Sequence, residues 1–156
     1  MKHLRITSPA FKGGEDIPAK YTCSGEGKNL PLKFKNTPSN TKSLVLIMDD
    51  PDIPQTVKEL MGIPVFDHWV VFNINPKEEE VKEGFEPEGI LGENTAGSLG
   101  YIAPCPPDRR HRYFIRLYAL DSRLELAEGA KRRDLEREMT SHIIEEAELM
   151  GLYERK

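Results

Sequence analysis

The sequence predicts a mainly β protein with one amphipathic helix near its C-terminus. Three segments, 43–49, 68–74 and 112–120, are short, apolar and bounded by proline or charged residues, a pattern typical of strands. Lys131–Met150 instead carries apolar residues at helical spacing, and Gly151 follows as a typical residue beyond a helix end. The apolar positions are Leu135, Met139, Ile143, Ala147 and Met150. We expect this helix to lie on the sheet.

Length and composition predict one soluble domain, residues 1–156. A chain of 156 residues buries roughly two-thirds of its unfolded surface. No apolar run approaches the roughly 20 residues that span a bilayer, and residues 1–7 become polar too early for a secretory signal. The 22 basic and 26 acidic residues give a net charge of −4, which argues against nucleic acid as a main partner. These features predict a cytoplasmic protein without a transmembrane segment.

The two cysteines, Cys23 and Cys105, are too few for a disulfide framework or a zinc knuckle. We expect both to be reduced, unpaired thiols in the cytosol. Charged residues make up 31% of the chain, which also suits a heat-adapted surface.

The first half of the chain predicts one central strand among loops. Residues 4–7 are expected to form a short strand, and 33–35 a short edge strand after a loop rich in glycine and proline. Ser43–Asp49 is apolar on both faces, so it should be central in the sheet. Asp49–Pro54 (DDPDIP) must end it, and its X-Pro bonds are candidates for a cis peptide.

Between the central strand and the third strand, the pattern is weaker. Val57–Met61 predicts a helical turn, and His68–Ile74 a strand that is apolar on both faces, with Trp69 in the core. Residues 75–103 have no clean period, and the acidic stretch Lys77–Glu88 is expected to be a solvated surface segment.

The segment 104–120 organises the rest of the chain. Pro104, Pro106 and Pro107 lack amide donors and restrict φ, so this part forms a stiff, extended loop. A strand follows, with an apolar inward row and an outward row. The inward row is Tyr113, Ile115, Leu117 and Ala119, and the outward row is Arg112, Phe114, Arg116 and Tyr118. His111 heads the inward row, at the rim of the interior.

Three titratable residues extend inward rows of the predicted strands. Asp50 continues the row of Leu44, Leu46 and Met48; His68 heads that of Val70, Phe72 and Ile74; His111 heads that of Tyr113. If the strands are neighbours, two imidazoles and a carboxylate converge at one end of the sheet.

Each of these residues also has a purely structural interpretation. A histidine at a strand start is commonly a hydrogen-bonded residue at the core edge, and Asp52 can form an Asx turn. Arg109 and Arg110 can be solvated surface charges. His142 is interpreted as structural.

Several motifs resemble the phosphatidylethanolamine-binding protein family, in particular its bacterial and archaeal branch of Raf kinase inhibitor-like proteins. Three of these motifs resemble the signature regions of the family: Asp50–Pro54 (DPDIP), Asp67–Ile74 (DHWVVFNI) and Tyr101–Tyr113 (YIAPCPPDRRHRY). Ile17–Gly25 is similar to the N-terminal loop of that branch, and His142–Tyr153 to its C-terminal helix. The resemblance covers nearly the whole chain.

The resemblance implies two packed, largely antiparallel sheets with a few peripheral helices and a small anion-binding pocket. Family members take phosphate, acetate or a phospholipid head group there. Carried over by position, the ligand-binding residues are Asp50, His68, His111 and Tyr113, with Asp52 and Pro54 shaping the loop.

The chain departs from the usual family pattern at the pocket. Ala103 replaces a glycine before Pro104, which adds a methyl group near the expected anion. Arg109 and Arg110 stand where relatives often have glycine before the His-Arg pair, and are expected to alter access or add positive charge. The stretch 29–34 is shorter than the proline-rich form that is usual in the family.

Three functions fit these features. The first is a non-enzymatic binding protein for a small anionic ligand, with His68 and His111 as donors. The second is a regulator of a protein partner, as an inhibitor of a kinase or a serine protease, and a homodimer is expected. The third is a hydrolase or metal-dependent enzyme using His111, His68 and Asp50, which the sequence disfavours because no nucleophile lies in a recognisable motif. No cofactor is implied.

Overall fold

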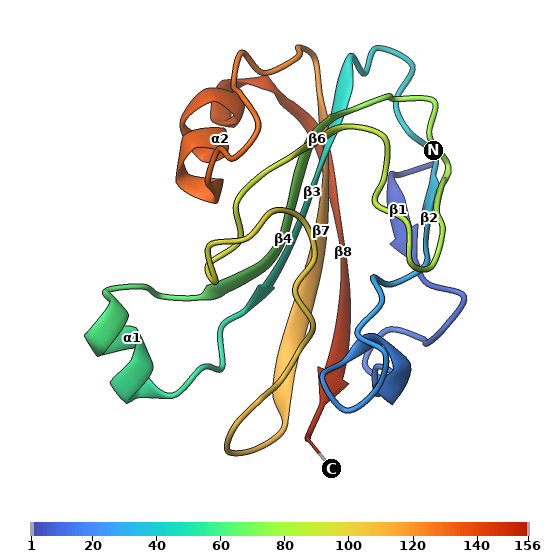
Figure 1. The fold of residues 1–156 in the computed structure, drawn as a ribbon. Coiled ribbons are helices and arrows are strands. Elements are labelled where there is room, and N and C mark those ends of the chain that lie inside the picture. The colour runs from blue at the N-terminus through green and yellow to red at the C-terminus, as the bar shows by residue number, and fades with distance from the viewer. Residues whose placement is uncertain (1, 156) are drawn as a thin grey trace.

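Two antiparallel sheets and two α-helices form the computed structural model, which describes residues 2–155 (Figure 1). The strands are β1 Arg5–Thr7, β2 Leu32–Lys35, β3 Ser43–Asp50, β4 Phe66–Ile74, β5 Glu80–Val81, β6 Ile90–Leu91, β7 His111–Leu120 and β8 Ile143–Tyr153. The helices are α1 Gln55–Met61 and α2 Arg132–Met139. The larger sheet has the order β6-β4-β3-β7-β8 and the smaller one β1-β2-β5, which confirms the predicted mainly β, two-sheet fold.

Strand β3 lies at the centre of the larger sheet, as its sequence predicted. All eight of its residues are buried, and it pairs with β4 on one side and β7 on the other. Successive side chains of a strand point to opposite faces, so Leu46 and Met48 enter one core while Val45 and Ile47 enter another.

The two cores lie on opposite faces of the larger sheet. Figure 1 shows α2 against one face, and β1 and β2 beyond the other. The core between the two sheets includes Phe34 from β2 and Ile115 from β7. The other core joins Leu135 and Met139 of α2 to the back of β3. The site described below opens from the first core.

A buried charge network attaches the first turn of α2 to the sheet. Arg132 Nη1 donates to Asp49 Oδ2 at 2.7 Å and to Asp67 Oδ1 at 3.0 Å, and Arg116 Nε donates to Asp49 Oδ2 at 2.8 Å. The side chain of Asp49 is only 1% exposed, so its charge depends on these two arginines. Burial raises the pKa of Asp67, and Arg132 opposes that rise.

The predicted helix over Lys131–Met150 is wrong in its second half. The helix ends at Met139, and residues 143–153 form β8, which pairs with β7 over its whole length. A spacing of four residues is an even number, so positions 139, 143 and 147 share a face in a strand as well as in a helix. Pairing with β7 decides between the two, because it supplies hydrogen bonds to an otherwise open strand edge.

Three smaller expectations also need correction. Strand β2 lies in the middle of the smaller sheet and is not an edge strand. Part of the acidic stretch 77–88 is structural: Val81 is buried in β5, and Glu86 Oε1 accepts a hydrogen bond from Trp69 Nε1 at 2.7 Å. Residues 2–155 contain no cis peptide bond, so the loop at 50–54 reverses with trans prolines.

None of the helices within residues 2–155 is long and apolar enough to cross a bilayer.

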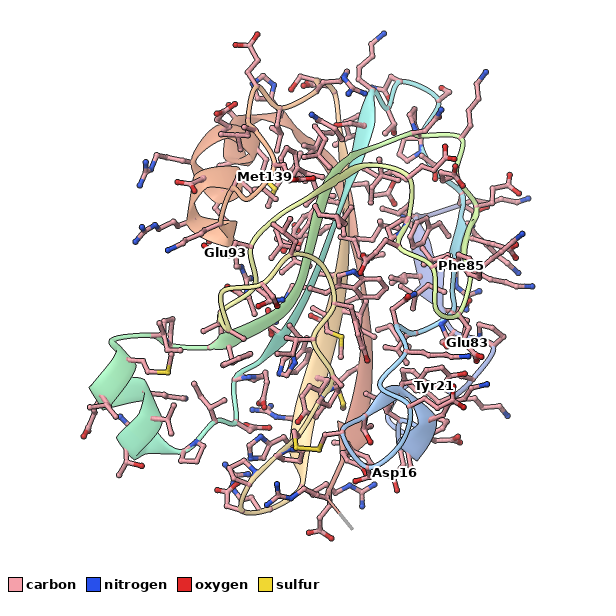
Figure 2. The ribbon with its side chains drawn as sticks, viewed as in Figure 1. Asp16, Tyr21, Glu83, Phe85, Glu93 and Met139 are labelled. Atoms are coloured by element: carbon pink, nitrogen blue, oxygen red, sulfur yellow. A yellow bond between two sulfur atoms is a disulfide. The ribbon has the colours of Figure 1, made fainter. Side chains whose placement is uncertain are left out.

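Met139 fills the core under α2 and is 3% exposed (Figure 2). We expect Met139→Ala to lower the free energy of unfolding by about 2–5 kcal/mol, because truncation leaves a cavity between the helix and the sheet. Urea denaturation followed by circular dichroism measures this, with exposed Arg137→Ala as the control. Equal stability of the two variants would contradict the assigned packing.

Candidate functional site

Asp50 and His111 meet at one end of the larger sheet. Strands β3 and β7 are antiparallel neighbours, so the last residue of β3 lies beside the first residues of β7. Asp50 Oδ2 and His111 Nδ1 are 2.7 Å apart, and both side chains are buried. The other oxygen of Asp50 accepts the amide hydrogen of Asp52 at 2.7 Å. This short side-chain-to-backbone bond turns the chain out of β3.

His68 reaches the same place through a β-bulge that the sequence did not reveal. Met48 pairs with Trp69 and Asp49 with Asp67, so His68 is an extra residue in β4. Trp69 faces the core between the sheets, whereas Val70 belongs to the core under α2. The predicted row of His68 with Val70 and Phe72 is therefore wrong. The bulge still leaves His68 beside the ring of Tyr113, with ring centroids 5.4 Å apart.

A main-chain contact fixes the orientation of the His68 ring. Its Nδ1 lies 2.8 Å from the carbonyl oxygen of Ile102, and the amide of Ile102 donates to the carbonyl of His68. Because a carbonyl only accepts, Nδ1 carries the hydrogen, and Nε2 binds a proton only when the ring is charged. Burial lowers the pKa of His68, so the neutral ring is favoured in the folded protein.

Tyr113 contributes a buried hydroxyl without a partner. Its side chain is fully buried between the two histidines, with ring centroids 5.4 Å from His68 and 6.4 Å from His111. Among residues 2–155, its hydroxyl forms no hydrogen bond of standard geometry, although the carboxylate of Asp50 lies close enough to act on it. Burial, followed by the negative charge of Asp50, raises the pKa of Tyr113. The phenol therefore keeps its proton and can donate it to a ligand.

Asp52 acts on the loop, not on the histidines. Its carboxylate accepts three hydrogen bonds from Arg112, at 2.8 Å from the amide and at 2.9 Å from both Nε and Nη2. These bonds lower the pKa of Asp52 to about 2. The Asx-turn alternative applies instead to Asp50. Pro54 precedes α1, and its carbonyl accepts the amide hydrogens of Val57 and Lys58.

The expectation of two free thiols is wrong. Cys23 and Cys105 form a disulfide with an S–S distance of 2.04 Å and Cα atoms 5.3 Å apart (yellow bond in Figure 2). The amide of Cys23 also donates to the carbonyl of Pro104 at 3.0 Å, next to half-buried Ala103. The N-terminal loop and the pocket loop are thus joined across 82 positions of sequence.

Sequence reasoning missed Asp108, which contacts the other side of the His111 ring. Its Oδ1 lies 2.7 Å from His111 Nε2, so both ring nitrogens face a carboxylate. This hydrogen bond lowers the pKa of Asp108. A signal existed in the sequence, because Asp108 is the acidic residue nearest His111 within the loop that leads into β7.

Tyr153 was also missed. It pairs directly with His111 across β7 and β8, it is 3% exposed, and its hydroxyl has no hydrogen bond within residues 2–155. A cleft of about 260 Å³ opens beside it, and its wall includes Arg110 and Asp16, which form an ion pair. The predicted C-terminal helix over Lys131–Met150 hid Tyr153, because it left no strand there to pair with β7.

No group of three or more His, Cys, Asp or Glu side chains within residues 2–155 is arranged to hold a metal ion.

Comparison with known proteins identifies the family. Residues 7–154 match the family described as phosphatidylethanolamine-binding protein. The chain belongs to the phosphatidylethanolamine-binding protein family. A Chlamydia trachomatis protein named "UPF0098 protein" is 46% identical, covering 97% of this chain and 99% of the relative. A protein of the same name from Methanothermobacter thermautotrophicus is 44% identical, again covering 97% and 99% of the two chains.

Solved structures of this family share the fold. A crystal structure of a phosphatidylethanolamine-binding protein homologue from Chlamydia trachomatis has a TM-score of 0.94 and 45% identity, covering 99% of both chains. Escherichia coli YbcL, described as a member of the mammalian family, has a TM-score of 0.86 over 99% of this chain and 100% of its own. At 24% identity, YbcL supports the fold alone.

We expect the Cys23–Cys105 bond to stabilise the folded protein by about 2–4 kcal/mol, because it closes a long loop in the unfolded chain. Adding dithiothreitol should lower the urea midpoint of the wild-type protein and leave a Cys23→Ser/Cys105→Ser double variant unchanged. A wild-type midpoint that does not respond to complete reduction would contradict this expectation.

Stability should also fall in mild acid through His68. Its pKa is lowered in the folded state, while the unfolded chain takes up the proton near pH 6.5. The free energy of unfolding therefore declines as pH drops below about 6.5 and levels off below the folded-state pKa. Urea denaturation between pH 8 and pH 4.5 should show a smaller decline for His68→Gln than for the wild type. The exposed His142→Gln variant serves as control and should behave like the wild type.

Proposed function

We propose that this protein is a non-enzymatic binding protein for small anions of the phosphate type, acting through the pocket of Asp50, His68, His111 and Tyr113. The observation that carries the proposal is the fully buried, unpartnered hydroxyl of Tyr113. A buried donor without an acceptor is unfavourable by about 1–3 kcal/mol, so a bound acceptor would relieve it. Tyr113 keeps its proton because its pKa is raised, so its hydroxyl can donate a hydrogen bond to a bound acceptor.

The two histidines supply the positive charge that an anion needs. His111 already donates Nδ1–H to Asp50, so an anion at Nε2 requires the imidazolium form. His68 donates Nδ1–H to Ile102, and its Nε2 becomes a donor on the same condition. Asp50 repels an anion directly. Its role in the proposal is to orient His111 and stabilise the charged ring.

The absence of catalysis is part of the proposal and is supported by the cysteines. Cys105, the thiol nearest the pocket in sequence, is bonded to Cys23 and cannot act as a nucleophile.

The predicted kinase or protease partner and the predicted homodimer stay predictions. A phospholipid head group and free phosphate present the same chemistry to the pocket.

Calorimetric titration tests the proposal. We expect inorganic phosphate and phosphoethanolamine to bind the wild-type protein, with higher affinity at pH 5.5 than at pH 8, because protonation of a histidine adds a donor and a positive charge. His111→Ala should weaken binding by roughly 1.5–3 kcal/mol, the value of one charge-assisted hydrogen bond. Asp50→Asn should flatten the pH dependence more than it changes affinity at pH 5.5.

The matched control is His142→Ala, which removes a histidine that contacts Asp121 at 2.7 Å on the surface. It should bind phosphate like the wild type. Wild-type affinity that is equal at both pH values, or normal binding by His111→Ala, would count against the proposal.

The cytoplasmic location likewise stays a prediction. The Cys23–Cys105 bond bears on it, because disulfides are rare in the cytosol outside heat-adapted organisms. Alkylation of free thiols in intact cells before lysis would show whether the bond exists where the protein works.

A further inference from the structure

The outer nitrogen of His111 already holds an anionic group, and that group belongs to the chain itself. Asp108 Oδ1 is 2.7 Å from Nε2, just as Asp50 Oδ2 is 2.7 Å from Nδ1. A neutral imidazole has a single N–H, so hydrogen bonds from both nitrogens fit the imidazolium form. One cation therefore lies between two carboxylates, at the position where the proposed ligand must bind.

Only one of these two carboxylates is free to leave. The Asp50 side chain is 3% exposed, and its second oxygen is held by the amide of Asp52. The Asp108 side chain is 41% exposed, and its other hydrogen bond goes to the amide of the next residue, Arg109. A rotation of the Asp108 side chain would free Nε2 without breaking any strand pair.

The backbone that carries Asp108 is well held. Pro106 and Pro107 precede it, and the Cys23–Cys105 bond anchors the loop three residues before Asp108. Asp108 is therefore tethered close to His111 even when its side chain has rotated away. A tethered group competes at a high effective concentration, of the order of millimolar or more.

The neighbouring arginines interact mainly with other partners. Arg110 pairs with Asp16, and Arg112 with Asp52. Arg109 Nη2 lies 3.4 Å from the carbonyl of Asp52, and its Nε is 3.9 Å from Asp108. His111 is thus the near cationic partner of Asp108.

We propose that Asp108 is an internal competing ligand that lowers the affinity of this site for every small anion by one common factor. The inference rests on the proposed anion-binding function and assigns an autoinhibitory contact to it. An anion can reach Nε2 of His111 only after the Asp108 side chain has left, so each ligand loses the same factor of affinity to the closed form. Phosphate and acetate should therefore be weakened alike, and the ratio of their affinities should not depend on Asp108.

The experiment compares inorganic phosphate with acetate in calorimetric titrations of the wild type, Asp108→Asn and Asp108→Ala at pH 6. The control is Asp121→Asn, which removes the same charge from an Asp–His contact of the same length on the surface. We expect Asp108→Ala to bind acetate and phosphate at least about tenfold more tightly than the wild type, with the same gain for both anions. Asp108→Asn should show a smaller common gain, because its amide oxygen is a weaker partner for His111 than a carboxylate. Asp121→Asn should match the wild type.

The outcomes separate this inference from the proposed function. Unchanged or weaker binding of both anions in the Asp108 variants, or a gain for phosphate that clearly exceeds the gain for acetate, would overturn the inference and leave the anion site in place. Phosphate binding by the variants alone would support it. Failure of every protein to bind phosphate would overturn both.

A second measurement covers the case in which Asp108→Ala folds poorly. Imidazole ¹⁵N signals of the wild-type protein report the Nε2 hydrogen bond of His111 directly. Phosphate, acetate and the Asp108→Asn substitution should all perturb the same Nε2 signal. An Nε2 signal that Asp108→Asn leaves unchanged would contradict the internal contact.

Discussion

The buried hydrogen bond between Asp50 and His111 joins the end of the central strand to the start of its neighbour, and most of the site depends on it. An isolated charge at this depth would be strongly unfavourable, so each partner needs the other. The second oxygen of Asp50 accepts a hydrogen bond from the Asp52 amide, and the second ring nitrogen of His111 contacts Asp108. The loops after β3 and before β7 are therefore arranged around one ion pair.

Two consecutive aspartates serve the two opposite faces of the sheet. Asp49 points to the back, where Arg116 and Arg132 hold it and attach α2. Asp50 points to the front, towards His111. Alternation along a strand is enough to explain this division. The pocket and the helix attachment share one strand end, so a change in the register of β3 would disturb both.

The candidate site combines a well-held frame with one exposed side chain. Prolines and the Cys23–Cys105 bond hold the backbone of the loop, and the carbonyl of Ile102 holds the ring of His68. A frame of this kind keeps donors in position, which reduces the entropy lost on binding. The side chain of Asp108 is 41% exposed, whereas those of Asp50 and His111 are buried.

The sequence by itself determined what depends on local alternation: the buried strands β3 and β7 and their inward rows, which bring Asp50 to His111 once the two strands are neighbours. Family motifs added the pocket residues. Only the tertiary structure decided four features: the β8 strand, the bulge at His68, the Cys23–Cys105 bond and the contact of Asp108 with His111. Each depends on a partner distant in sequence or on loop geometry. An even spacing such as 139, 143 and 147 satisfies helix and strand alike, and only the unpaired edge of β7 makes residues 143–153 a strand.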